Sequence, residues 1–250
     1  SDTYYQNNSI QNAKSIEKHG VVANNVFPSD MDKGILEVQQ TLSSSFDEGN
    51  LITHFIGHGG KSIWRVGPQD LRKNRDLFTL DHISKLQNSN RLPFVMSMSC
   101  YSAPFDHPFA DSIGEKFIRE PEVGAVAVLA SSWRNAPNTL LSRYILESLY
   151  EKPQQSIGQA ILEGKRRYKG RIMVEMYNLL GDPALKLAIP SLKMTSSNNQ
   201  GEIDVKIDTD SFQGKALIET IDINANVLSS KEIDVTGNQF NFKIEESNPD

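Results

Sequence analysis

Two residues of this chain have side chains that could perform nucleophilic catalysis, His58 and Cys100. Cys100 is the only cysteine in 250 residues, so it forms no disulfide within the chain. A cysteine attacks as its thiolate, which a neighbouring imidazole favours. His58 lies between glycines in Gly57-His58-Gly59-Gly60, which leave room for a substrate backbone. The pair predicts a base and a nucleophile; a buried structural cysteine and a turn histidine are the alternatives without chemistry.

Two other motifs overlap this stretch and predict different chemistry. Residues 60–62, Gly-Lys-Ser, match the end of a phosphate-binding P-loop, but Phe55 stands where that motif needs its first glycine. His54 and His58 have the spacing of a zinc site on a helix. Phe55 again replaces the required residue, here a glutamate, and the segment reads as a strand followed by a turn. We therefore expect neither phosphate binding nor a metal site.

Each candidate follows an apolar run that predicts a strand. These runs cover residues 51–56 before His58, 92–99 before Cys100, and 124–130 before Ser131, Ser132 and Trp133. Apolar spacing predicts helices between and after them, at about residues 32–46, 81–86, 108–117, 138–150 and 154–168. Alternating strands and helices indicate an α/β fold with a mostly parallel sheet flanked by helices. Ligands of such sheets bind beyond the carboxyl ends of the strands, where all these candidates are expected.

Other residues near these runs are less specific. Trp133 is a candidate wall of a substrate pocket, with core packing as the alternative. Asp106 and His107 follow the cysteine and could line the site, although an Asp-His-Pro run is also typical of a helix cap. Residues 21–27 predict a short strand that ends at Pro28, and the polar residues before them predict no element.

The composition changes after Pro190. Apolar residues there alternate with Ser, Asn, Thr and Asp, around residues 203–207, 216–221 and 240–244. This period of two, with turn residues between the runs, predicts β-hairpins. We therefore predict a catalytic domain over residues 1–189 and a β-rich segment over residues 190–250.

Charge and hydropathy exclude some classes of function. The 26 basic and 31 acidic residues give a net charge of −5 and are scattered along the chain, so no basic stripe predicts nucleic-acid binding. No apolar run approaches the roughly 18 residues of a membrane span. The first residues do not have the pattern of a secretory signal. A single cysteine leaves the redox compartment open.

Four motifs in the same order resemble the gingipain family of cysteine peptidases. They are the strand followed by Gly-His-Gly at residues 57–59, the stretch 86–94 leading to Ser99-Cys100, the strand at 124–127, and Leu-Gly-Asp-Pro-Ala-Leu at 180–185. The histidine precedes the cysteine by 100 − 58 = 42 residues. The similarity covers roughly residues 30–189.

The resemblance implies a caspase-like fold and catalysis through a thioacyl-enzyme. His58 matches the general acid/base, Cys100 the nucleophile, and the backbone amides of Gly59 and Cys100 the oxyanion hole. Residues 131–133 are expected to bind substrate, with Trp133 as the aromatic wall. The segment after residue 190 is similar in placement to an immunoglobulin-like domain.

The resemblance also implies polypeptide substrates and a secreted or cell-surface location in a bacterium, with additional domains in the full-length protein. No cofactor is required for the chemistry, and structural calcium occurs in some members. No acidic residue aligns with the pocket that selects a basic side chain, so that preference is not carried over. Peptide hydrolysis is the first hypothesis. Sortase-like transpeptidation and a non-catalytic caspase-like binding or adhesion module are the alternatives.

Overall fold

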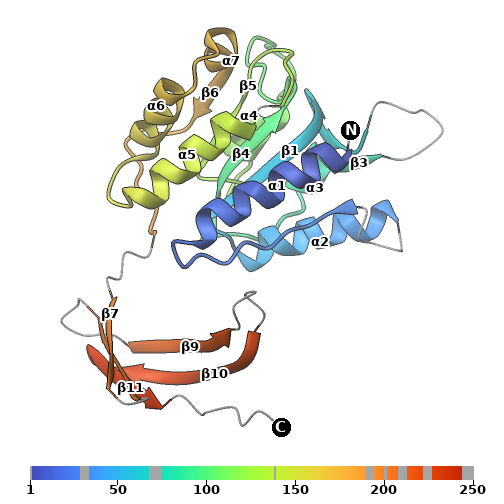
Figure 1. Cartoon of the computed structure of the whole chain (residues 1–250). Helices are drawn as coiled ribbons and strands as arrows, with labels where there is room; N and C mark the ends of the chain where they lie inside the picture. The colour runs from blue at the N-terminus through green and yellow to red at the C-terminus, as the bar shows by residue number, and fades with distance from the viewer. Residues whose placement is uncertain are drawn as a thin grey trace. The chain divides into compact units, whose positions relative to one another are not determined.

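The computed structural model describes residues 2–28, 34–67, 75–137, 139–189, 194–199, 202–207, 213–221 and 227–243. The chain divides into two compact units, residues 1–189 and 190–250 (Figure 1). The first unit carries every candidate site residue.

A six-stranded sheet with the order β3-β2-β1-β4-β5-β6 forms the centre of the first unit. Its strands are β1 (Ile52–Gly60), β2 (Ile63–Arg65), β3 (Asp76–Thr79), β4 (Phe94–Ser99), β5 (Ala127–Ser131) and β6 (Tyr177–Leu180). β1, β4 and β5 run parallel, whereas β2, β3 and β6 are antiparallel to their neighbours. All six residues of β4 are buried, as expected for a central strand with helices on both faces. The predicted α/β fold with a parallel central sheet is confirmed.

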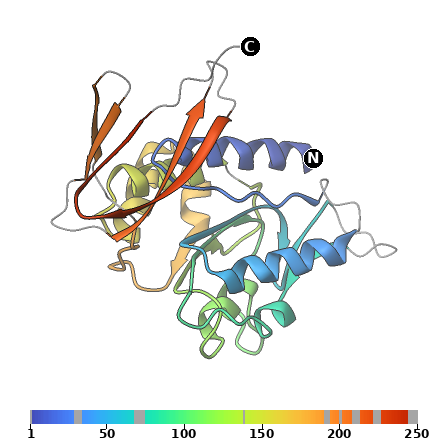
Figure 2. The ribbon, with the colours of Figure 1, turned by 90° about the horizontal axis from the view of Figure 1, so that it is seen from below.

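Helices cover both faces of this sheet (Figures 1 and 2). They are α1 (Asp2–Glu17), α2 (Ile35–Glu48), α3 (Leu80–Ile83), α4 (Ile113–Arg119), α5 (Thr139–Glu151), α6 (Ile157–Arg167) and α7 (Arg171–Met176). Met96 and Met98 of β4 belong to the apolar cluster that includes α5, α6 and parts of α1. Val95 belongs to the cluster on the opposite face, which includes α2 and α4. Even-numbered positions of β4 therefore face α1 and α5, and odd-numbered positions face α2 and α4.

The N-terminal region differs from the sequence-based prediction. α1 forms in the polar stretch where no element was predicted, and residues 21–27 form no strand because they pair with no neighbour. The first residues of the helix predicted at about 32–46 lie outside the described residues, and the helix begins at Ile35.

The helix predicted from Pro108 also begins later. α4 starts after Ser112, whose hydroxyl accepts a hydrogen bond from the Glu115 amide while the Glu115 carboxylate bonds back to Ser112. This capping box defines the start of the helix. Pro108 and the exposed Phe109 lie in the preceding loop.

The sequence predicted that the glycines around His58 form a turn after the strand. In the structure they belong to the strand itself. β1 continues through them to Gly60 and turns into β2, with His58 opposite Arg65 and Gly60 opposite Ile63. Antiparallel pairing supplies the backbone partners that keep these residues extended. The Leu-Gly-Asp-Pro-Ala-Leu motif also adjoins the sheet, because β6 ends at its first residue, Leu180.

The second unit consists of two small antiparallel sheets. β9 (Gln213–Ile221) pairs with β10 (Val227–Thr236), and β8 (Glu202–Ile207) lies between β7 (Met194–Asn199) and β11 (Gln239–Lys243). Ile207 and Val235 are buried within it. Among the helices of the described residues, none has the length and apolar character to cross a membrane.

Candidate active site

His58 and Cys100 lie at the carboxyl ends of neighbouring parallel strands. The register of β1 and β4 runs from Ile52 opposite Phe94 to Gly57 opposite Ser99. His58 and Cys100 each follow the last pair by one residue, so the sheet brings their backbones side by side. Strand alternation directs both side chains toward the face that carries α1. Both residues are partly exposed, so a molecule from solvent can reach them.

Gly59 is packed against the end of β4. A Cβ atom on residue 59 would lie 2.5 Å from Ser99 Oγ and 3.0 Å from the Cys100 carbonyl oxygen. Real Cβ atoms do not approach other atoms this closely, so residue 59 must lack a side chain for β1 and β4 to meet here.

The backbone direction of Gly59 follows from the same ladder. The Phe94 N–H donates to the Leu51 carbonyl, at 3.0 Å. Backbone polar groups alternate in direction along a strand, so odd-numbered residues of β1 turn theirs toward β4 and even-numbered residues turn theirs away. The Gly59 amide therefore faces the end of β4, where Cys100 lies.

The imidazole of His58 contacts α1. The Tyr5 ring lies edge-on to it, with 5.2 Å between ring centroids and 89° between planes. Nε2 of His58 is inaccessible to solvent and has no hydrogen-bond partner among the described residues.

A chain of buried hydroxyls supports Cys100 from the opposite face of the sheet. Trp64 Nε1 donates to Ser97 Oγ at 2.9 Å, and Ser97 Oγ lies 3.0 Å from Ser99 Oγ and 3.1 Å from Ser102 Oγ. All four side chains are buried. Sequence analysis did not find this network. The sequence feature that indicates this network is the pair Ser97 and Ser99, which alternate with methionines on a strand that is otherwise apolar.

The loop after β5 reaches the same end of the sheet. The Tyr101 N–H donates to the Trp133 carbonyl at 3.1 Å, and the two rings meet edge to face at 5.9 Å. Tyr101 has a φ of +52°, a left-handed conformation that turns the chain sharply after Cys100. The Trp133 side chain is 54% exposed. Trp133 therefore contacts Tyr101, the residue that follows Cys100.

Ser131 and Ser132 hold this loop in place. Ser131 is fully buried, and its hydroxyl donates to the Trp133 carbonyl at 2.7 Å. The Ser132 hydroxyl donates to the Met176 carbonyl at 3.2 Å and accepts from Asn178 Nδ2 at 3.0 Å. These bonds fasten the loop to itself and to β6, so both hydroxyls are engaged within the protein.

The remaining candidates lie apart from this arrangement. Asp106 and His107 are exposed in the loop before α4, where His107 Nδ1 accepts from the Phe109 amide at 3.3 Å. His54 lies on β1, deeper under α1, and desolvation by burial lowers its pKa to about 4. His54 is therefore neutral at pH 7. In the part of the chain that the structure describes, no group of three His, Cys, Asp or Glu side chains could hold a metal ion.

An α/β unit with a histidine and a cysteine at the ends of adjacent parallel strands contains the two residue types that thiol-based catalysis uses. Comparison with known proteins extends this conclusion, because the model of peptidase family C25 matches residues 2–188. The chain therefore belongs to peptidase family C25, a family of cysteine peptidases.

Individual relatives agree with this assignment. Gingipain R1 of Porphyromonas gingivalis is 22% identical over 213 residues, which cover 78% of this chain and 20% of that protein. Gingipain R2 of the same species is 23% identical over 161 residues, or 58% of this chain and 21% of that protein. The chain thus spans about a fifth of the length of these curated relatives.

A solved structure establishes the likeness of fold. The crystal structure of the Arg-specific cysteine proteinase gingipain R superposes with a TM-score of 0.57 at 20% identity, covering 96% of this chain and 56% of that chain. The complex of its pro- and mature domains gives the same TM-score, 0.57. These structures confirm the predicted caspase-like fold, and the match to the family model confirms the predicted family.

Proposed function

We propose that this chain hydrolyses peptide bonds through a His58–Cys100 dyad. The observation that supports the proposal is the register of β1 and β4, which ends with Gly57 opposite Ser99, so that His58 and Cys100 are the next residues of the two chains. His58 takes the proton of the Cys100 thiol, and the thiolate sulfur attacks the carbonyl carbon of the scissile bond. The protonated imidazole then gives its proton to the leaving amine, which leaves a thioester on Cys100. Water hydrolyses the thioester and restores the thiol.

Backbone amides supply the oxyanion hole in this mechanism. The Gly59 amide faces the end of β4, and the Cys100 amide is the second donor that the family resemblance implies. Donors fixed by a sheet need no reorganisation as negative charge develops on the carbonyl oxygen.

Substrate would bind along the exposed loop after β5. Trp133 offers a half-exposed aromatic surface next to Tyr101, and the hydrogen-bonded hydroxyls of Ser131 and Ser132 fix the backbone that carries it. We therefore propose that Trp133 forms a wall of the pocket for the side chain preceding the cleaved bond. Ser131 and Ser132 position this wall.

Labelling by peptidyl acyloxymethyl ketones tests the dyad. These probes alkylate an activated cysteine, so the wild type should be labelled, and Cys100→Ala and His58→Ala should lose labelling by 100-fold or more. His107→Ala is the matched control, because His107 is exposed and lies in the loop after Cys100. Labelling of His58→Ala at the wild-type rate would refute the dyad. The peptide sequence of the most reactive probe is then offered as a substrate. Its hydrolysis would show a peptidase, whereas a binding module would leave it intact.

Location and calcium dependence are proposals that rest on the family alone. We propose that the protein works outside the cytoplasm of a bacterium, and cell fractionation tests this. The proposed mechanism uses only protein groups and water, so calcium would act on the fold rather than on the chemistry. Activity measured in chelator and in added calcium shows whether the ion supports the fold.

A further inference from the structure

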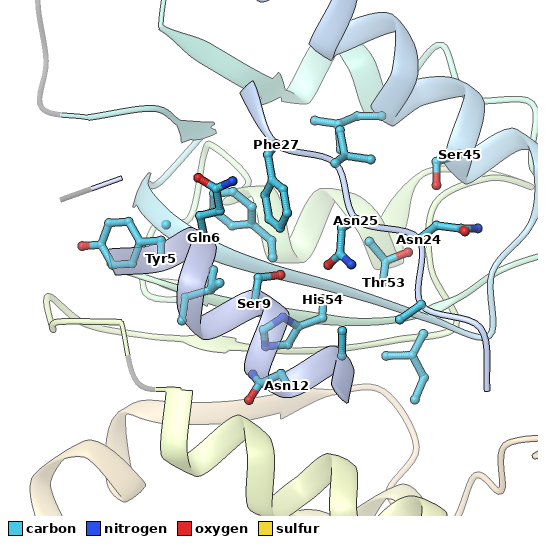
Figure 3. A pocket seen from close by; sticks show the side chains of 18 of the residues that line it. Tyr5, Gln6, Ser9, Asn12, Asn24, Asn25, Phe27, Ser45, Thr53 and His54 are labelled. Atoms are coloured by element: carbon cyan, nitrogen blue, oxygen red, sulfur yellow. The ribbon is translucent and has the colours of Figure 1, made fainter. Parts of the chain in front are cut away.

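A cavity of about 560 Å³ lies beside the first six residues of β1 (Figure 3). α1 lines one side with residues that include Ser9 and Asn12, and α2 lines the other with Val38 and Leu42. The wall opposite β1 is the segment of residues 21–28, which passes between α1 and α2 (Figure 2). The cavity therefore has the position of a strand in a sheet, with a helix on each face, β1 along one edge and residues 21–28 along the other.

The edge of β1 that faces this cavity, opposite β4, has no paired strand over residues 52–57. β1 pairs with β4 over residues 52–57, but only residues 58–60 pair with β2 on the other edge. The even-numbered residues Ile52, His54 and Ile56 turn their N–H and C=O groups away from β4, toward the cavity. Between the described residues 21–28 and 52–57 there is no backbone hydrogen bond. Three donors and three acceptors thus face the cavity in a row.

Two buried side chains of β1 also lack partners. His54 Nε2 and Thr53 Oγ1 are inaccessible to solvent and have no hydrogen-bond partner among the described residues. They belong to adjacent positions and so point to opposite faces of the strand. Leaving buried polar groups unsatisfied is costly, so the cavity is suited to a polar occupant.

We infer that this cavity accepts an extended polypeptide segment from outside the 250-residue chain, which adds as a strand to the free edge of β1. A row of alternating backbone groups is satisfied by another strand, whose own groups have the same spacing. Six residues of β1 correspond to a segment about 20 Å long. Its side chains toward Val38 and Leu42 of α2 would be apolar, and those toward Ser9 and Asn12 of α1 would be small or polar.

Fusion of a test strand to the N-terminus probes this site directly. Thr3 lines the cavity, so a Gly/Ser linker of about 20 residues, with a mean reach of roughly 25 Å, can deliver a Thr-Val-Thr-Val-Thr-Val strand. Hydrogen exchange is then measured at individual amides. We expect the amides of Ile52, His54 and Ile56 to exchange at least tenfold more slowly than in the unfused chain. The amides of Thr53 and Phe55, which face β4, serve as internal controls.

Two controls separate strand addition from other effects. The same fusion with proline in place of every valine lacks alternate N–H donors and should give no protection. This control leaves the body of the protein unchanged, so its folding is not in doubt. Leu42→Trp, which fills the cavity, should abolish the protection, whereas Leu36→Trp on the same helix should not, because Leu36 is 65% exposed.

Three results would overturn the inference. They are unchanged exchange at the three outward amides in the valine fusion, equal protection by the proline fusion, and protection that persists in a folded Leu42→Trp variant. Concentration-dependent dimerisation of the unfused chain that protects the same amides would also overturn it, because a second copy would then occupy the edge.

Discussion

Replacing Gly59 by alanine should damage both the fold and the site. The added Cβ would lie 2.5 Å from Ser99 Oγ, 2.7 Å from Ser99 Cβ and 3.0 Å from the Cys100 carbonyl oxygen. Ser99 cannot rotate away cheaply, because it is buried and its hydroxyl lies 3.0 Å from that of Ser97. The ends of β1 and β4 must therefore separate. Overpacking of this kind costs about 1–3 kcal/mol of unfolding free energy.

Gly60→Ala is the matched control for this prediction. The nearest atom to a Cβ at residue 60 is Ile63 Cγ1, at 3.7 Å, which is ordinary contact. Its backbone conformation also requires no glycine, because Gly60 has no positive φ. We expect the stability of Gly60→Ala to stay within about 0.5 kcal/mol of wild type.

Urea denaturation and active-site labelling of the two variants provide the test. Gly59→Ala should unfold at lower urea concentration and should label Cys100 at least tenfold more slowly at a urea concentration where it is fully folded. Gly60→Ala should behave as wild type in both assays. Equal behaviour of the two variants would refute the close packing of residue 59 against β4.

Two further predictions follow from buried polar groups. Burial lowers the pKa of His54 to about 4 from 6.5, so the unfolded chain binds a proton that the folded chain excludes, and stability is lost as pH falls from 6.5 to 4. The loss reaches about 3 kcal/mol, since 2.5 units correspond to roughly 1.36 kcal/mol each. Urea midpoints at pH 7 and 4.5 should show a smaller acid loss in His54→Gln than in wild type; equal losses would contradict the assignment. Asn88→Ala should cost about 2–4 kcal/mol, because the buried Asn88 amide bonds both backbone groups of Gly124 at 2.9 Å. Exposed Gln87→Ala is its control, and similar unfolding of the two variants would show that this clamp contributes nothing.

Apolar runs and their order were sufficient to predict the central sheet. The run before Cys100 is a fully buried parallel strand, and the run before His58 is a parallel strand that is buried only at Ile56 and Gly57. Helices on both faces of the sheet favour apolar side chains on both sides of such strands. α1 was not predicted, because its sequence does not show the apolar pattern that identifies such elements. Its sequence is polar and lacks a strong apolar face, so its position comes from tertiary contacts such as those of Tyr5 and Ile16 with the sheet.

Glycine was the main source of error around the candidate site. Gly57, Gly59 and Gly60 were interpreted as a break in structure because glycine weakens isolated strands. In the folded chain they remain in β1, and Gly59 serves close approach to Ser99. Such an approach joins residues 40 positions apart, 99 − 59, and no local pattern contains it.

The attachment of the Trp133 loop has a consequence for how this protein can change during evolution. The loop is fastened mainly by backbone carbonyls and by the hydroxyls of Ser131 and Ser132, while the half-exposed Trp133 side chain packs edge-on against the Tyr101 ring. Substitutions of residue 133 can therefore spread without unfolding the protein. Because residue 133 lies on a different loop from His58 and Cys100, a change there would alter the surface beside the proposed dyad without altering the dyad itself.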